Sequence, residues 1–452
     1  MLVFYNDDSF QVLRGRFLNP QTDTQCQYLR DALLIGERRE DGCRIVDFGD
    51  ATSLAERYGW DLDRIPCNPG LILPPFYDLH FHWVQDDVRD APKVSLLEWL
   101  ERYTFPEEAR FADADYAEIK AKAFWRRIHS LGTVGGLCYS SIHDEALDAA
   151  MRHAPAGFHI GGVLMTMNCP ALLRQSKQEA IEAAKRGAAS YGSRYCVTPR
   201  FAPTTHPEVM KAGAGIAREN DLFQQTHLDE TLAEIDWVLG IYEEFEGFQD
   251  VGSYTEIYQR CDMLGPKTVM GHAIHLSEDE LELLAQSDTA IASCPTSNAP
   301  TEVRGLGSGL FNFEQVESAG IRWGLASDIG GGPYLSMFDV IDSFVSQNRE
   351  AGRDGATYAK ALYRSTLAGA EILQVAESKG NFAPGKSFDC IHCPLPDTAA
   401  RLSSAETLLP VLIAQASARS QRDELVETTV LEGKQVFSRP QLLLSQSKRG
   451  IA

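Results

Sequence analysis

The sequence predicts an α/β fold, a (β/α)8 TIM barrel with a small β-sandwich built from N- and C-terminal segments. Short β-rich apolar runs alternate with amphipathic segments through the centre of the chain. Eight such runs occur within roughly 260 residues, which is typical of a (β/α)8 barrel. Further β-rich runs lie near both chain ends, outside this alternation. Because strands that alternate with helices form a parallel sheet, the central part predicts the barrel.

Amphipathic segments separate most of the central runs, as at 116–132, 206–220 and 277–287. An open, doubly wound sheet is the alternative for this pattern. No GxGxxG motif follows the first run, and this favours the barrel. The runs expected as barrel strands are YDLHFH (77–82), TVGGLCYS (133–140), FHIGGVLM (158–165), RYCVTPRF (194–201), LFQQTH (222–227), KTVMGH (267–272), TAIASCP (289–295) and IRWGLASD (321–328).

The two ends of the chain predict a second, smaller unit. We expect residues 1–70 and 386–452 to pair into the small β-sandwich, and residues 71–385 to form the barrel. The runs that carry this expectation are FQVLRGRFL (10–18), DALLIG (31–36), CRIVDFG (43–49), SFDCIHC (387–393) and TTVLEGKQVFS (428–438).

Composition limits the classes of partner. The chain has 452 residues, 44% of them hydrophobic, so it can bury a large core. Its formal charge of −21 disfavours a nucleic-acid polymer, because an acidic surface repels phosphates, and a small ligand fits better. No apolar run reaches the ~18 residues of a membrane span, and MLVFYNDDSF lacks a signal-peptide pattern. The 10 cysteines show no CxxC spacing, so we expect a cytoplasmic protein without a cysteine-based zinc site.

Ligand-type side chains stand at the ends of several expected strands. His80 and His82 end the first run, and residues i and i+2 of a strand share one face. His227, His272 and Asp328 end three other runs. Because the carboxyl ends of barrel strands form the catalytic face, we expect these side chains to meet. Each alone is explained as a hydrogen-bonded polar residue, but together they indicate a metal site. Imidazoles with one carboxylate suit Zn²⁺ or Fe²⁺.

Three further polar residues lie near these strand ends. Glu230 follows His227 by three residues, which suits a general acid and base; a glutamate in the first turn of a helix is the alternative. Arg200 ends the fourth run and offers forked donors to a carbonyl oxygen, or a salt bridge as the alternative. Gln85 can both donate and accept, which would match the amide-like edge of a heterocycle.

With His80-x-His82, His227, His272 and Asp328 in this order, the chain resembles the metal-dependent amidohydrolase superfamily. Within it, the chain is most similar to the guanine deaminases, from about residue 70 to residue 393. The motifs that carry this similarity are LLEWLERYTFPEEARF (96–111), VTPRFAPTTHPEVM (197–210), THLDET (226–231), CPTSN (294–298), GSGLFN (307–312), SDIGGG (327–332) and GNFAPGKSFD (380–389). EWLxxYTFP and TPRFAP are much more specific than HxH, which the whole superfamily shares.

The resemblance implies a mononuclear zinc hydrolase, with Fe²⁺ as the alternative metal, that forms a homodimer and acts in purine catabolism. The metal ligands that it implies are His80, His82, His227 and Asp328. His272 would hydrogen-bond the metal-bound hydroxide. The expected reaction is hydrolysis of guanine to xanthine and ammonia.

The resemblance also implies how the base is held and protonated. The positions that match contacts to the base are Gln85, Arg200, Phe201 and Glu230. We expect His227 to contact the base as well. Glu230 would protonate the ring nitrogen N3, Asp328 would accept the proton of water, and hydroxide would attack C2. Arg200 would bind the 6-oxo group. The expected catalytic residues are therefore Glu230, Asp328 and His272.

Several local departures leave the identity of the ring open. Residues 74–76 read PPF where the family usually has PGF, and Ser293 replaces a commonly larger residue. Trp83 places a bulky ring beside the expected pocket, and we include it among the substrate contacts. APTEVRGL (299–306) is longer than the corresponding family segment and follows the seventh run, on the catalytic face. His143 either lines the pocket or belongs to a loop.

Two alternatives follow. The first keeps the mechanism and changes the substrate to another amino-substituted N-heterocycle, such as a pterin, 8-oxoguanine or a triazine. The second is a non-catalytic scaffold of the same fold, as in superfamily members that have lost their metal ligands. All the ligand positions and Glu230 are retained here, and this favours the enzyme.

Overall fold

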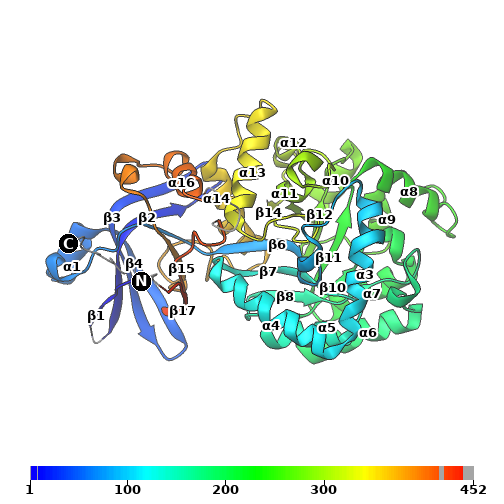
Figure 1. The fold of residues 1–452 in the computed structure, drawn as a ribbon, viewed down its shortest axis with the longest axis horizontal. Coiled ribbons are helices and arrows are strands. Elements are labelled where there is room, and N and C mark those ends of the chain that lie inside the picture. The colour runs from blue at the N-terminus through cyan, green and yellow to red at the C-terminus, as the bar shows by residue number, and fades with distance from the viewer. Residues whose placement is uncertain (1, 8, 417–421, 441–452) are drawn as a thin grey trace, which may run out of the picture.

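The computed structural model describes residues 2–7, 9–416 and 422–440. Residues 1, 8, 417–421 and 441–452, which belong to the predicted terminal segments, lie outside the described residues. Two groups of strands lie side by side (Figure 1). One contains the central runs with helices packed around them, and the other contains strands from both ends of the chain. No helix in the described ranges is long and apolar enough to cross a bilayer.

Every run predicted as a barrel strand contains a strand, and the third run is divided by Gly162 into two strands. Adjacent strands pair in parallel, as expected for alternating strands and helices. The residues of β7 are all buried, which is typical of a parallel strand covered on both faces. The strands are β6 (Phe76–His82), β7 (Thr133–Tyr139), β8 (Phe158–Gly161), β9 (Val163–Leu164), β10 (Cys196–Pro199), β11 (Phe223–Leu228), β12 (Thr268–His272), β13 (Ala290–Ser293) and β14 (Trp323–Leu325).

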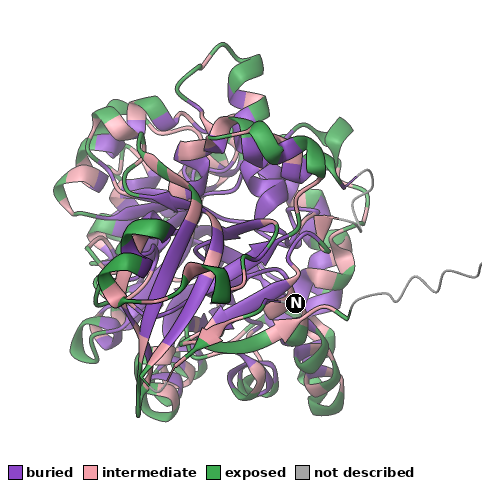
Figure 2. Cartoon of the chain, turned by 90° about the vertical axis from the view of Figure 1, so that its left-hand side faces the viewer, coloured by how far each residue is buried: buried purple, intermediate pink, exposed green. Residues whose placement is uncertain are grey.

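Helices surround these strands (Figure 1). Figure 2, which views the molecule from the side of the terminal strands, shows largely buried strands and exposed outer faces of the helices. Capping boxes begin several of them, as at Ser176 with Glu179, Thr231 with Glu234 and Ser277 with Glu280. The helices are α2 (Leu96–Trp99), α3 (Phe105–Ala109), α4 (Ala114–Ser130), α5 (Asp144–His153), α6 (Lys177–Tyr191), α7 (Pro207–Glu219), α8 (Leu232–Tyr242), α9 (Tyr254–Arg260), α10 (Glu278–Gln286), α11 (Pro295–Asn298), α12 (Phe313–Ser318), α13 (Met337–Glu350), α14 (Tyr358–Ser365) and α15 (Leu367–Ile372).

The central strands do not form one closed ladder, so the expected closed barrel is found only in part. They divide into a 6-stranded sheet in the order β14-β13-β12-β11-β10-β9 and a 3-stranded sheet β6-β7-β8. An isolated bridge between Ile160 and Tyr195 links the two sheets. At the other junction, the buried carboxylate of Asp78 accepts the amide of Ser327 at 2.9 Å. A side chain of β6 therefore occupies a position where a strand-to-strand bond would complete the barrel.

The terminal segments form one 8-stranded sheet in the order β17-β16-β15-β5-β2-β3-β4, with β1 beside β2. The same segments contain the helices α1 (Ala51–Tyr58) and α16 (Ala405–Ala414). The two ends of the chain pair where β15 meets β5, although β5 begins just past the expected boundary at residue 70. The strands are β1 (Tyr5–Asn6), β2 (Phe10–Pro20), β3 (Cys26–Arg39), β4 (Gly42–Asp50), β5 (Leu71–Leu73), β15 (Cys390–Cys393), β16 (Thr428–Leu431) and β17 (Lys434–Ser438).

The expected sandwich of two separate sheets is not confirmed. The amide of Ile45 in β4 donates to Lys386 at 2.7 Å, and the amide of Phe388 donates to Cys43 at 2.9 Å. These bonds join one edge of the sheet to the segment that enters β15. Ile45 and Val430, from opposite ends of the strand order, pack into the same hydrophobic core. The terminal sheet therefore curls around its own core.

Candidate active site

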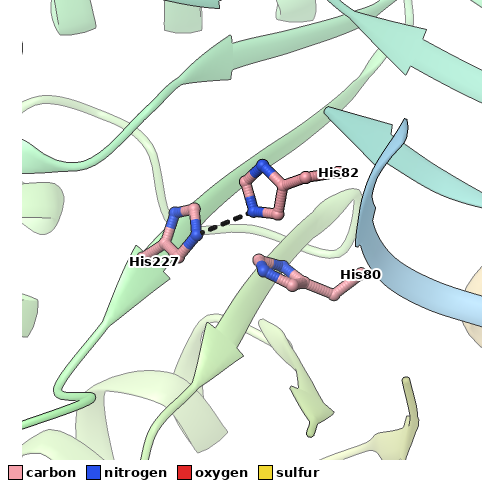
Figure 3. Close-up of side chains that lie close together, drawn as sticks. All are labelled: His80, His82 and His227. Carbon is pink, nitrogen blue, oxygen red and sulfur yellow. Dashed lines mark hydrogen bonds between the residues drawn. The ribbon is translucent and has the colours of Figure 1, made fainter. Parts of the chain in front are cut away.

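Three histidines meet at the carboxyl ends of β6 and β11 (Figure 3). Nε2 of His82 lies 3.2 Å from Nε2 of His227. Oδ1 of Asp328 lies 3.4 Å from Nε2 of His80 and 3.6 Å from Nε2 of His82. His80, His82 and Asp328 are buried, and His227 is partly buried. The structure thus brings together the side chains that the sequence analysis placed at a common metal site.

Gly271 gives the ring of His80 its space. A Cβ atom at position 271 would lie 2.5 Å from Cε1 of His80 and 2.7 Å from its Nδ1. These distances are far below van der Waals contact. The glycine of KTVMGH therefore lets β12 approach the imidazole closely, and any larger residue at position 271 would displace the ring.

The orientation of His227 is set by a main-chain carbonyl. Its Nδ1 lies 2.7 Å from the carbonyl oxygen of Arg200, which can only accept, so Nδ1 carries the proton. Nε2 is then the unprotonated nitrogen, and it faces His82. Burial lowers the pKa of His80, His82 and His227 well below the usual value, with the neighbouring histidines adding to the effect. The imidazoles are therefore neutral at pH 7 and can act as ligands.

Asp328 and His272 occupy left-handed backbone conformations, with φ of 44° and 71°. Non-glycine residues reach this region at a cost of about 1–2 kcal/mol, and such strain concentrates at functional sites. The amide of Asp328 donates to the carbonyl of His80 at 2.8 Å, which anchors the turn after β14 beside β6. Nδ1 of His272 accepts Nδ2 of Asn298 at 3.0 Å. Its Nε2–H therefore faces the carboxylates of Glu230, at 3.5 Å, and Asp328, at 4.0 Å.

Glu230 lies two residues beyond β11 and is buried. Burial, and secondly the charge of Asp328, raise its pKa to about 8. Oγ of Ser308 donates to its Oε1 at 2.9 Å, and Nδ2 of Asn298 donates to the same oxygen at 3.4 Å. At neutral pH the carboxyl group therefore holds a proton that it can transfer, as a general acid requires.

These side chains share one cavity, with about 370 Å³ of empty space including its opening to solvent. Apolar and polar side chains line it together, as in most ligand sites. The predicted site residues among its lining are His82, Gln85, Arg200, Phe201, His227, Glu230, His272 and Asp328, and the others are Leu96, Trp99, Leu100, Glu234, Leu306 and Gly331. His80 lies beneath them, against Gly271.

The profile of the Amidohydrolase family matches residues 69–436. The chain belongs to the amidohydrolase family.

Within this family the chain is similar to guanine deaminases. The guanine deaminase of Escherichia coli is 31% identical over 380 residues, covering 82% of this chain and 83% of that protein. Its solved structure superposes with a TM-score of 0.80 at 27% identity, covering 95% of this chain and all of the other. A guanine deaminase of C. acetobutylicum with bound guanine has a TM-score of 0.78 at 24% identity over 95% of this chain, which supports the fold. The resemblance inferred from the sequence motifs is confirmed.

The residues of this amidohydrolase fit a bound metal ion. Ligand atoms of His80, His82 and His227 lie within 4.8 Å of one another. Nε2 of His80 is buried and has no hydrogen-bond partner among the described residues. Two ligands of a tetrahedral ion, each about 2.0–2.2 Å from it, are roughly 3.3–3.6 Å apart. The Nε2 atoms of His82 and His227 are 3.2 Å apart, and Oδ1 of Asp328 lies 3.4 and 3.6 Å from Nε2 of His80 and His82, all close to that range.

The structure places Trp83 away from this cavity. Its ring packs edge-on against Phe111, with centroids 4.9 Å apart, and its Nε1 donates to Oγ of Ser140 at 3.1 Å. Trp83 instead lines a separate cavity with Phe111. The short 3₁₀ segment Trp83–Val88 follows His82 directly, so alternation of faces ends there and the indole turns into the core. Our expectation that Trp83 contacts substrate does not match this geometry.

Among the described residues that line the cavity, neither His143 nor Ser293 is present. His143 is the N-cap of α5, and Ser293 is buried in β13. The segment 299–306 contributes Leu306 to the cavity wall. Arg304 forms an ion pair with Asp90, and its carbonyl accepts Nζ of Lys93 at 3.0 Å. The segment 299–306 therefore forms part of the cavity wall through Leu306 and is tied by Arg304 to Asp90 and Lys93.

Sequence reasoning did not assign Glu108, Asn298 or Ser308, although each contacts a site residue. All three lie within motifs that carry the family resemblance, YTFPEEARF, CPTSN and GSGLFN. Membership of a specific motif was the signal that could have identified them. Their partners are far away in sequence, so neither spacing nor residue type shows what they contact.

Proposed function

We propose that this amidohydrolase is a zinc-dependent aminohydrolase that converts guanine to xanthine and ammonia. The observation that carries the proposal is the convergence of His82, His227 and Asp328 on one cavity with the buried acid Glu230, and of His80 on Asp328 beneath it. The similarity to guanine deaminases supports the choice of substrate.

The proposed metal ligands are His80, His82, His227 and Asp328. These residues would hold a zinc ion, which would lower the pKa of water from about 15.7 to about 7 and so supply a nucleophile at neutral pH. Asp328 takes a proton from the attacking water. Glu230 gives its proton to N3 of the ring, which makes C2 electrophilic. The resulting hydroxide adds to C2, and Asp328 passes its proton to the 2-amino group, which leaves as ammonia. The C2 hydroxyl returns a proton to Glu230 as the 2-oxo group forms.

The base is held by side chains from two segments, the 3₁₀ segment Trp83–Val88 and the residues that follow β10. We propose that Arg200 donates to the 6-oxo group and that Gln85 contacts the same edge. Phe201 packs beside His227, with ring centroids 6.1 Å apart, and offers an apolar surface to the purine. His272, through Nε2–H, faces both carboxylates and stabilises the charge that develops on the reacting oxygen.

The test is incubation of purified, zinc-loaded protein with guanine, a pterin, 8-oxoguanine and a triazine, with ammonia and products measured. Xanthine and ammonia released from guanine in equal amounts support the proposal. Turnover of another ring without guanine turnover keeps the reaction class and changes the substrate. The outcome that favours a non-catalytic scaffold is the absence of both bound metal and turnover. Elemental analysis, expected at about one zinc per chain, distinguishes zinc from Fe²⁺.

We also propose a cytoplasmic homodimer, with residues 71–385 as a (β/α)8 barrel and residues 1–70 and 386–452 as a flanking domain. The family resemblance supports the dimer. Two observations support this division. The amide of Asp328, after β14, bonds the carbonyl of His80 at the end of β6, and β15 pairs with β5. Light scattering of the purified protein tests the dimer, since a mass of one chain would contradict it.

A further inference from the structure

Glu108 lies behind the cavity and holds two of its side chains. It stands on α3 and its side chain is fully buried. Nη1 of Arg200 donates to its Oε2 at 2.7 Å and to its Oε1 at 2.9 Å. Nε2 of Gln85 donates to the same Oε1 at 2.7 Å. Gln85 and Arg200 line the cavity, so one carboxylate connects the two side chains that we propose to read the edge of the base.

These contacts determine which atoms a ligand can meet. A carboxylate only accepts hydrogen bonds, so the amide nitrogen of Gln85 must face Glu108 and the amide oxygen Oε1 is left for a ligand. Likewise, Glu108 engages Nη1 of Arg200, which leaves Nη2 and Nε as donors. The edge-reading pair therefore offers one acceptor, from Gln85, beside donors from Arg200.

Gly330 leaves space at this acceptor. Its backbone has φ of +117°, and a Cβ there would lie 2.2 Å from Oε1 of Gln85. The first glycine of SDIGGG therefore lets the loop after β14 pass close to the amide oxygen.

We propose that Glu108 is a positioning residue that makes the cavity select a lactam edge, in which a ring N–H stands beside a carbonyl. The proposal rests on the proposed function and adds the basis of its selectivity. The acceptor of Gln85 matches the N–H, and the donors of Arg200 match the carbonyl. An amidine edge has a bare ring nitrogen beside an amino group. It would place an acceptor against the acceptor of Gln85 and a donor against the donors of Arg200. Buried polar groups left unpaired in this way weaken binding strongly.

Hypoxanthine and adenine test this proposal directly because they differ only at this edge. Their dissociation constants are measured by calorimetry on the zinc-loaded enzyme. Wild type is expected to prefer hypoxanthine by at least tenfold. In Glu108→Gln this preference is expected to fall at least tenfold. A glutamine at position 108 can donate to Gln85, which allows the amide group of Gln85 to flip. Zinc content is expected to stay unchanged.

Glu107→Gln is the matched control. Glu107 precedes Glu108 on α3, but it bonds Arg110 at 2.8 Å and Tyr116, on the far side from the cavity. This variant is expected to keep the wild-type preference. If Glu108→Gln does not fold, Glu108→Asp takes its place, since it keeps the charge that Arg200 needs but is too short to reach both partners. It is expected to lose preference as well.

Three results overturn the proposal: wild type without the preference, a folded Glu108 variant whose preference stays within twofold of wild type, or equal weakening of both purines. Failure of this proposal and failure of the proposed function give different results. Guanine turnover by wild type, with a preference that survives Glu108→Gln, contradicts only the role of Glu108. A preference that depends on Glu108 in an enzyme that does not deaminate guanine contradicts only the proposed substrate.

Discussion

The carbonyl oxygen of Arg200 accepts the Nδ1 proton of His227 at 2.7 Å, while the guanidinium of the same arginine lines the cavity. One residue thus orients a proposed metal ligand through its main chain and is proposed to contact the base through its side chain. A substitution at position 200 removes only the second role, because the main-chain carbonyl remains. The two roles of Arg200 can therefore be separated by experiment.

Arg200→Met is expected to weaken substrate binding and to leave metal content unchanged. It also removes the partner of a buried carboxylate, and breaking a buried ion pair from one side costs about 3–5 kcal/mol. The free energy of unfolding, from denaturant titration, is therefore expected to fall by a few kcal/mol. Adding Glu108→Gln is expected to restore part of the stability but not the binding. A single variant as stable as wild type would contradict this account of the Arg200–Glu108 pair.

Glu230→Gln is expected to lower kcat by about 10²–10⁴-fold, because the amide cannot supply the proton that general acid catalysis needs. Zinc content, measured by elemental analysis, is expected to stay at the wild-type level, since Glu230 is not among the proposed ligands. Ser308→Ala, which removes only the 2.9 Å bond to Glu230, should have a much smaller effect on kcat. Near-normal turnover by Glu230→Gln would remove Glu230 from the mechanism.

The convergence of the proposed ligands could be predicted because it follows from two rules. The i, i+2 spacing places His80 and His82 on one face of a strand, and parallel strands bring His227 and His272 to the same edge. The first rule is local, and the second requires only that alternating strands and helices form a parallel sheet. The central strands were recognisable for a similar reason, since runs buried on both faces are continuously apolar.

The contacts that could not be predicted are tertiary. Glu108 reads as one more acidic residue of a short helix, and only the fold brings it to Arg200, 92 positions away. Trp83 turns away from the cavity because the chain leaves strand geometry directly after His82, and nothing in the sequence marks that change. The curl of the terminal sheet depends on bonds between β4 and residues 386–388, which strand patterns do not specify.

Gly271→Ala is expected to lower metal affinity by more than tenfold, because the new methyl group would lie 2.5 Å from the ring of His80. Competition with a chelator measures the affinity. Gly215→Ala is the control: Gly215 lies within α7, and a Cβ there meets no atom within 4 Å. That change is expected to keep the metal and to add about 0.4–1 kcal/mol of stability. Equal metal affinity in both variants would show that Gly271 does not position His80.

The pH dependence of stability is expected to include a contribution from Glu234. Burial, and secondly the charge of Glu230, raise its pKa from 4.5 to about 8. Between these values the folded chain holds a proton that the unfolded chain releases. The stabilisation is therefore fully present below about pH 4.5 and is lost as pH rises towards 8, with a limiting slope of about 1.4 kcal/mol per pH unit.

Glu234→Gln removes this titration and keeps an oxygen that accepts the amides of Glu230 and Thr231. Relative to wild type, the variant is expected to gain stability as the pH rises from about 5 to about 8. Glu179→Gln is the matched control, because Glu179 holds the same capping-box position in α6 but is exposed, and its backbone hydrogen bond lowers its pKa. It should show no such gain. Denaturant titrations at both pH values measure the difference, and parallel profiles for Glu234→Gln and wild type would mean that Glu234 is already ionised in the folded protein.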